Sequence, residues 1–168
     1  MNQRRQQGTM KTAGTVLALA LVTNTLLALG PMQHLRNEET LAKLNLNATE
    51  LKQVISGVEA LAFDSPDSWE KELVGRRISL GSAPGLVLQG THLLCGATGN
   101  CQIFVFRRDG KDWVPLFAGQ GAPIIEGFSF GPGSSHGIKD LHVVSNRSAE
   151  SGAGVLYKFD GKFYRPAR

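Results

Sequence analysis

The spacing of apolar positions changes once along the chain, close to residue 75. Before that point, apolar residues recur at the i, i+3, i+4 and i+7 spacing that places them on one face of an α-helix. These residues are Leu51, Val54, Ile55, Val58 and Ala62. Asn47 and Glu50 precede them with the spacing of a capping box, in which the cap and the residue three positions later exchange hydrogen bonds. The pattern predicts a helix that starts next to Asn47.

Two shorter helices are predicted on either side of this one. Asn37, followed by two glutamates, resembles a helix start, and Ser65-Pro66-Asp67 places a proline at a first helical position. Gly75 would end the second of these helices. We therefore expect residues 31–75 to form a helical segment.

Beyond residue 75, short apolar runs alternate with Gly, Pro and Asp, which is typical of strands joined by tight turns. The runs are 86–89, 92–95, 103–107, 113–117, 141–145, 155–159 and 163–165. Asp109-Gly110 and Asp160-Gly161 each lie between two such runs, and an Asp-Gly pair suits the positive φ angles of a type I′ hairpin turn. Residues 76–168 are therefore predicted to form one antiparallel β domain.

The two predicted hairpins resemble each other. FRRDGKDWVP, starting at Phe106, aligns with YKFDGKFYRP, starting at Tyr157, and the runs led by His92 and His142 precede them at a nearly equal offset. This spacing suggests a repeat, although two units cannot close a propeller, and convergence of two short hairpins is the alternative. The sequence predicts an α+β protein that is mainly β. Short N-terminal helices would precede a small antiparallel sheet, a sandwich or partly open barrel, with two hairpin repeats.

Residues 136–160 resemble one repeat of the FG-GAP type of β-propeller. The likeness rests on HGIKDLHVV, starting at His136, and on GVLY, starting at Gly154, which fit a G-x-x-D strand start followed by a glycine-led second strand. Members of that family precede the first strand with an acidic calcium-binding loop. The corresponding residues here, GFSFGPGSSHG from Gly127, contain no carboxylate. The resemblance therefore implies a strand pair without calcium, and we expect neither a metal nor a cofactor.

Residues 1–30 have the features of a membrane-targeting segment. Arg4, Arg5 and Lys11 come before or beside an apolar run at 13–30, and the segment has no acidic residue. The run is 18 residues long and contains polar side chains, which is the lower limit for a membrane span. Its end, Ala-Leu-Gly, is a weak cleavage site followed by an unfavourable proline. A cleaved signal peptide and an uncleaved anchor both stay open, and either predicts a periplasmic, secreted or membrane-anchored protein.

The net charge of the whole chain is +4, but the leader accounts for most of it. Without its three basic residues, 15 of the 18 basic residues remain against 14 acidic ones, a net charge of +1. A body so close to neutral has no field that would attract a phosphate backbone. We therefore expect no nucleic-acid partner.

Cys95 and Cys101 are the only cysteines of the chain, and they enclose five residues, Gly-Ala-Thr-Gly-Asn. A closely spaced pair in an exported chain most often forms a disulfide. Such a ring would stiffen a loop between two strands. Metal binding together with His92, or a redox pair, are the alternatives, although the C-x-x-C spacing of redox pairs is absent.

Three histidines and one aspartate are the candidates for catalysis or metal binding. His92, His136, His142 and Asp140 could gather in one site, because Asp140 and His142 share one face of a predicted strand. A serine nucleophile is disfavoured, because Ser134 and Ser135 adjoin His136 in sequence and no G-x-S-x-G elbow is present. An exported hydrolase or metal-dependent enzyme is therefore an alternative function.

Two loops form the predicted binding surface. One is the tip of the cysteine ring, residues 96–100, and the other is the segment 128–137, which combines aromatic side chains with glycine and proline. The predicted contact residues are Asn100, Phe128, Phe130, Ser134, Ser135 and His136. We expect a non-catalytic module that binds a protein or an envelope polymer, and that contacts the membrane if its leader is uncleaved. A purely structural envelope protein is the other alternative.

Overall fold

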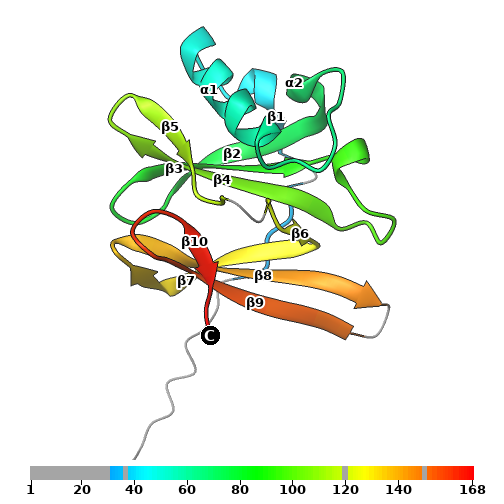
Figure 1. The fold of residues 1–168 in the computed structure, drawn as a ribbon, viewed down its shortest axis with the longest axis vertical. Helices are drawn as coiled ribbons and strands as arrows, with labels where there is room; N and C mark the ends of the chain where they lie inside the picture. The colour runs from blue at the N-terminus through cyan, green and yellow to red at the C-terminus, as the bar shows by residue number, and fades with distance from the viewer. Residues whose placement is uncertain (1–30, 36–37, 119–120, 149–150) are drawn as a thin grey trace, which may run out of the picture.

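Two antiparallel sheets pack face to face, and the helices cover the outer face of the larger sheet (Figure 1). The computed structural model describes residues 31–35, 38–118, 121–148 and 151–168, so the predicted leader lies outside the described residues. Within those ranges, no helix is long and apolar enough to cross a membrane. The protein is mainly β with few helices, and its sheets form an open sandwich rather than a closed barrel. The predicted fold class is thus confirmed.

The larger sheet has six strands, in the order β1-β2-β3-β4-β5, with β6 paired to β4. Its strands are β1 (Glu39–Thr40), β2 (Leu73–Ser79), β3 (Pro84–Gly90), β4 (Cys101–Asp109), β5 (Asp112–Pro115) and β6 (Ile124–Ile125). Residues 86–88 of β3 and 103–106 of β4 are fully buried. Because helices cover one face of these strands and the second sheet covers the other, they are apolar at consecutive positions instead of alternate ones.

The smaller sheet has four strands, in the order β10-β9-β8-β7. They are β7 (Gly127–Ser135), β8 (Ile138–Ser148), β9 (Ser151–Phe159) and β10 (Tyr164–Pro166). Here the side chains alternate. Phe128 and Leu141 belong to the core, and Val143, which pairs with Phe128 and Val155, lies on the same inner face. The main core therefore lies between the two sheets.

The longest helix confirms the prediction made from its apolar face. It is α1 (Ala48–Glu59), and both hydrogen bonds of the capping box between Asn47 and Glu50 are present at 3.0 Å. Its residues Val54 and Val58 are buried. Gly57 lets the helix approach the larger sheet closely, since a Cβ atom there would lie 2.6 Å from the ring of Phe106. This contact holds α1 against β4 and β5.

The segments on either side of α1 differ from the prediction. Glu39–Thr40 forms strand β1, followed by the 3-10 turn η1 (Leu41–Lys43), instead of a short helix. Helix α2 (Trp69–Glu72) begins later than predicted and passes directly into β2. Gly75 lies inside β2, where a Cβ atom would come within 2.2 Å of the backbone oxygen of Val87. The glycine thus permits close strand packing, and residues 31–75 contribute two strands as well as helices.

The hairpin turns use positive φ angles at other positions than predicted. Gly110 and Gly161 have φ values of +59° and +101°, but the aspartate before each glycine has no positive φ, so neither pair is a type I′ turn. Two consecutive positive φ angles, +50° and +78°, occur instead at His136-Gly137, which joins β7 to β8. His136-Gly137, which was predicted to lie in a loop, therefore has the φ angles of a type I′ turn.

The proposed repeat does not extend beyond these turns. Arg108 pairs with Trp113 and Phe159 pairs with Tyr164, so the two hairpins have the same local register. Upstream, however, His92–Leu94 is the 3-10 turn η2, whereas His142 lies in the middle of strand β8. Different structures at equivalent positions give no support to a repeated unit of about 50 residues.

Candidate functional site

The sandwich has two distinct ends (Figure 1). At one end lie the four hairpin turns that join β2 to β3, β4 to β5, β7 to β8 and β9 to β10; we call it the hairpin end. At the other end lies the loop between β3 and β4, which carries the cysteines, together with β6 and the first residues of β4; we call it the ring end. The predicted site residues are divided between the core and these two ends.

The aromatic residues of the predicted binding loop belong to the core. Residues 127–135 form strand β7, not a loop, and Phe128 is only 1% exposed. Phe130 is half-buried, and its ring packs edge-on against that of Phe128 at a centroid distance of 5.8 Å. Both point toward the larger sheet because they pair with Val143 and Leu141 of the inner face. The burial of these rings does not favour Phe128 and Phe130 as contact residues, and their assignment as binding residues stays a prediction.

Ser134, Ser135 and His136 lie together at the hairpin end. Ser134 and His136 are exposed, whereas Ser135 donates a hydrogen bond of 2.8 Å to Oδ1 of the buried Asp140. The ring of His136 also makes an edge contact with Phe159, at a centroid distance of 6.5 Å. The exposed side chains of Ser134 and His136 thus lie at a turn whose position is fixed by strands β7 and β8.

This turn is joined to a turn of the other sheet. The backbone N–H of Ser82, between β2 and β3, donates to the carbonyl of Gly137 at 2.9 Å, and Lys139 N–H donates to Leu80 at 2.8 Å. Gly81, with a φ of +100°, allows the approach, because a Cβ atom there would lie 2.6 Å from the Gly137 oxygen. The two sheets are therefore locked together at the position of the exposed serine and histidine.

Strand β10 adds a further connection between the sheets. The backbone N–H of Tyr164 donates to Leu116 at 2.7 Å, and its hydroxyl donates to the Lys139 carbonyl at 2.6 Å. Burial, assisted by the charge of nearby Asp140, raises the pKa of Tyr164, so the phenol stays protonated and continues to donate.

The β9–β10 turn is organised by Asp160, whose carboxylate accepts hydrogen bonds from the backbone N–H groups of Phe163 and Lys162. These bonds, the Phe163 bond foremost, lower the pKa of Asp160 to about 2.

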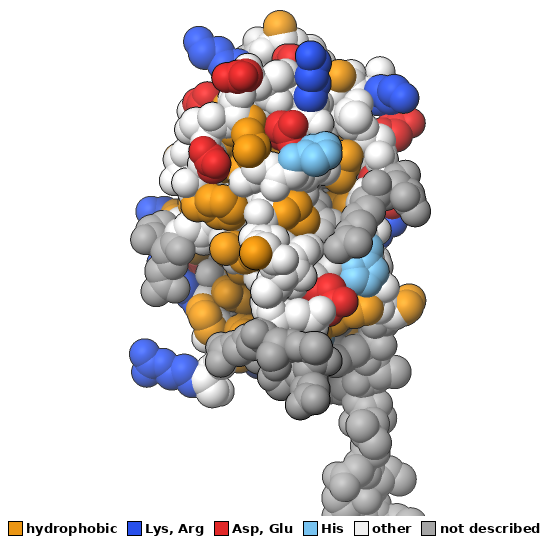
Figure 2. All heavy atoms as spheres, turned by 90° about the vertical axis from the view of Figure 1, so that its right-hand side faces the viewer, with side chains coloured by type: hydrophobic (Ala, Val, Ile, Leu, Met, Phe, Trp, Pro, Cys, Tyr) orange, Lys and Arg blue, Asp and Glu red, His pale blue; other side chains and the backbone are white. Residues whose placement is uncertain are grey.

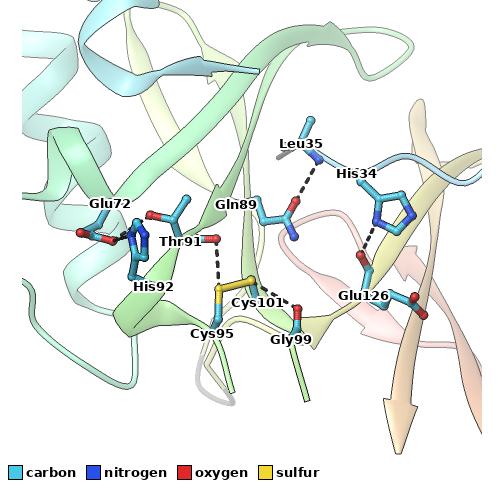
Figure 3. The surroundings of a disulfide bond; sticks show 11 residues. His34, Leu35, Glu72, Gln89, Thr91, His92, Cys95, Gly99, Cys101 and Glu126 are labelled. Atoms are coloured by element: carbon cyan, nitrogen blue, oxygen red, sulfur yellow. Dashed lines mark hydrogen bonds and ion pairs between the residues drawn. A yellow bond between two sulfur atoms is a disulfide. The ribbon is translucent and has the colours of Figure 1, made fainter. Parts of the chain in front are cut away.

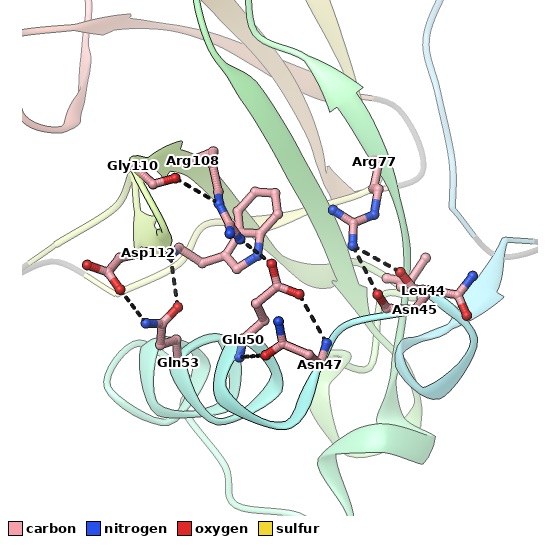
Figure 4. Close-up of polar contacts among 10 residues, drawn as sticks. Leu44, Asn45, Asn47, Glu50, Gln53, Arg77, Arg108, Gly110 and Asp112 are labelled. Atoms are coloured by element: carbon pink, nitrogen blue, oxygen red, sulfur yellow. Dashed lines mark hydrogen bonds and ion pairs between the residues drawn. The ribbon is translucent and has the colours of Figure 1, made fainter.

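A cleft of about 760 Å³ opens at the hairpin end between the start of α1 and the β4–β5 turn (Figure 4). It is lined by Asn47, Ala48, Thr49, Glu50, Gln53, Arg108, Lys111 and Asp112. Glu50 pairs with Arg108, and the backbone N–H of Asn47, followed by Arg108, lowers the pKa of the Glu50 carboxyl. The side chain of Gln53 donates to Asp112 at 2.6 Å and accepts the backbone N–H of Trp113 at 3.1 Å. The cleft therefore offers both hydrogen-bond donors and acceptors on a fixed frame.

Sequence reasoning missed the role of the arginine pairs beside this cleft. The guanidinium groups of Arg77 and Arg108 lie over the ring of Trp113, at 5.6 Å and 5.2 Å from its centroid, and Arg107 lies over Phe159 at 5.7 Å. Each contact joins residues far apart in sequence or on neighbouring strands. The pairs Arg76-Arg77 and Arg107-Arg108 alone gave no signal for these contacts, because a solvated strand edge has the same pattern.

The four residues proposed for catalysis do not converge. His92 lies at the ring end, where its Nδ1 atom is 3.2 Å from Glu72, whereas His136 lies at the hairpin end (Figure 3 shows the His92 surroundings). His142 lies against Gly154 of β9, and Asp140 is engaged by Ser135. Among the described residues, no three His, Cys, Asp or Glu side chains form a group that could hold a metal ion.

The predicted disulfide between Cys95 and Cys101 is present and closes the loop 96–100 (Figure 3). Asn100, a predicted contact residue in this loop, is only 5% exposed. Its amide donates to the carbonyl of Asn146 at 2.8 Å and accepts the N–H of the same residue at 3.4 Å. The ring thus fixes a side chain that clamps the larger sheet to β8 of the smaller one.

No family model, no curated protein and no solved structure matches this chain.

Proposed function

We propose that this protein is a non-catalytic extracytoplasmic binding module that engages a protein or an envelope polymer through its hairpin end. The observation that carries the proposal is the lock between the β2–β3 and β7–β8 turns, where backbone hydrogen bonds fix exposed polar groups contributed by both sheets. Binding loops work best on a rigid scaffold, because less conformational entropy is lost on association. Ser134 and His136 stand on such a scaffold.

The chemistry of the hairpin end favours a polar partner. Its exposed groups are a hydroxyl, an imidazole and the amide and charged side chains of the cleft beside α1, which donate and accept hydrogen bonds. Several of its charges are paired, as in the contacts of Glu50 with Arg108 and of Asp160 with Arg165. A partner recognised by hydrogen bonds fits this surface better than one recognised by net charge.

An extracytoplasmic location is supported by two features of the chain. The disulfide between Cys95 and Cys101 is compatible with an oxidising compartment, and the acid-free basic start with its apolar run favours export. The positions of the candidate residues do not support the enzyme alternative, since His92 lies apart from the other three. A purely structural envelope role would not need the exposed groups of the hairpin end.

The test is photo-crosslinking of the full-length chain in its own envelope. A photoreactive residue at position 134 should capture a defined partner, whereas the same residue at position 98, on the ring, should not. Ser134→Ala combined with His136→Asn should then reduce capture severalfold with little change in stability, because both side chains are exposed and asparagine tolerates the positive φ of position 136. Thr98→Ala is the matched control. Equal capture by the double variant and the wild type would contradict a role for the hairpin end.

A further inference from the structure

The chain is fixed to the ring end almost as soon as the apolar run ends. Gln33 and Phe128 exchange backbone hydrogen bonds of 2.7 and 3.2 Å, and the His34 ring bonds to the Glu126 carbonyl at 2.7 Å. The next residue, Leu35, is buried and donates its N–H to Gln89 at 3.0 Å. Residues 33–35 therefore form a rigid part of the ring end instead of a flexible linker.

This attachment limits how far the body can lie from the apolar run at 13–30. Three peptide units separate Gly30 from Gln33, and a fully extended chain spans at most about 11 Å over that distance. The polar headgroup layer of one leaflet is itself roughly 5–7 Å thick. If the run stays in the bilayer, Gln33 must lie within the headgroup layer or directly above it, and the ring end must face the lipid.

The exposed apolar side chains of the described residues gather at this same end. Exposed large hydrophobic residues are Met32 (38%), Phe63 (53%), Leu93 (52%) and Ile124 (43%). Met32 precedes the Gln33 contact, and Leu93 lies in η2 beside the ring. Ile124 pairs with Gln102, whose side chain accepts the N–H of Phe63 at 3.1 Å. Figure 2 faces this end and shows hydrophobic side chains across its middle.

We propose that residues 13–30 remain as an uncleaved membrane anchor and that the ring end rests on the lipid surface through these apolar side chains. Charged groups at this end include the His92–Glu72 pair and Glu126, and the basic side chains that the structure describes form no cluster there. Contact with lipid is therefore apolar, and it depends little on salt or on anionic lipid. The proposal goes beyond partner binding: it orients the molecule, with the hairpin end directed away from the membrane.

The test places a fluorescent reporter at each end of the full-length chain. Phe63→Trp puts an indole at the ring end, and Phe163→Trp puts one in the β9–β10 turn at the hairpin end. Each variant is reconstituted in phosphatidylcholine vesicles with brominated acyl chains, which quench tryptophan near the hydrocarbon. The wild type supplies the background from Trp69 and Trp113. We expect severalfold greater quenching for Phe63→Trp than for Phe163→Trp, unchanged at high salt.

Two results would overturn the proposal. One is equal quenching of the two reporters, or stronger quenching of Phe163→Trp, with far-UV circular dichroism showing both variants folded. The other is an N-terminus after residue 30 in protein isolated from its own envelope, because a cleaved leader removes the tether. Neither measurement involves a partner, so the lipid contact and the proposed binding function fail separately.

Discussion

The side chain of Asn100 connects the disulfide ring of the larger sheet to the backbone of Asn146 in the smaller sheet. Replacing it with alanine removes both hydrogen bonds to Asn146 and leaves a backbone N–H and a carbonyl without partners. At about 1 kcal/mol for each hydrogen bond, Asn100→Ala should lower the free energy of unfolding by about 2 kcal/mol. The loop-entropy estimate for a ring closed by Cys95 and Cys101 is also about 2 kcal/mol.

These two contributions should be coupled, because the ring holds Asn100 in position. Urea unfolding followed by tryptophan fluorescence, with the full-length chain in mild detergent, gives the effect of Asn100→Ala in the oxidised and in the reduced protein. We expect the loss to be clearly smaller after reduction, since a released loop no longer presents the amide to Asn146. Thr98→Ala, in the same loop and exposed, should change stability by less than about 0.5 kcal/mol. The reasoning fails if Asn100→Ala has the same effect in both redox states.

Two further predictions concern the hairpin end. The depressed pKa of Asp160 means that its carboxylate stabilises the fold above the unfolded-state value of 3.8, and that this contribution is lost as the pH falls toward about 2. Asp160→Asn should therefore reduce the pH dependence of the unfolding free energy in that window, measured by urea titrations; an unchanged slope would show that Asp160 does not contribute. Gly137→Ala should destabilise by roughly 1–2 kcal/mol, because its φ is +78° and a Cβ atom would lie 2.8 Å from Oγ of Ser82. Gly96→Ala, where the Cβ meets only one atom at 3.9 Å, is the control, and an equal loss there in thermal unfolding would refute the explanation.

The features that the sequence predicted correctly are those set by local interactions. The capping box of α1 joins residues three positions apart, and the disulfide joins cysteines six positions apart, so both are visible in a short stretch of sequence. The mainly β class followed from the density of turn residues after residue 75. Each of these depends on neighbours that the chain itself brings together.

The features that were missed depend on contacts between distant segments. Residues 128–137 contain three glycines and a proline and were taken for a loop, yet pairing with β8 makes most of them a strand and buries Phe128. Asn100 was assigned to a surface because nothing near it in sequence indicates Asn146 as its partner, 46 residues away. The candidate site at the hairpin end likewise needs two turns from different sheets, and their meeting cannot be deduced from either turn alone.

The contact between α1 and β5 has a consequence for how copies of this protein behave toward one another. Strand β5 lies at the edge of the larger sheet, and an open edge is a template on which another chain can add a strand and begin to aggregate. The side chain of Gln53 accepts a hydrogen bond from the backbone N–H of Trp113 on that edge. Pro115, the last residue of the strand, has no backbone N–H to donate. The helix and the proline thus protect this edge from pairing with a strand of a second copy.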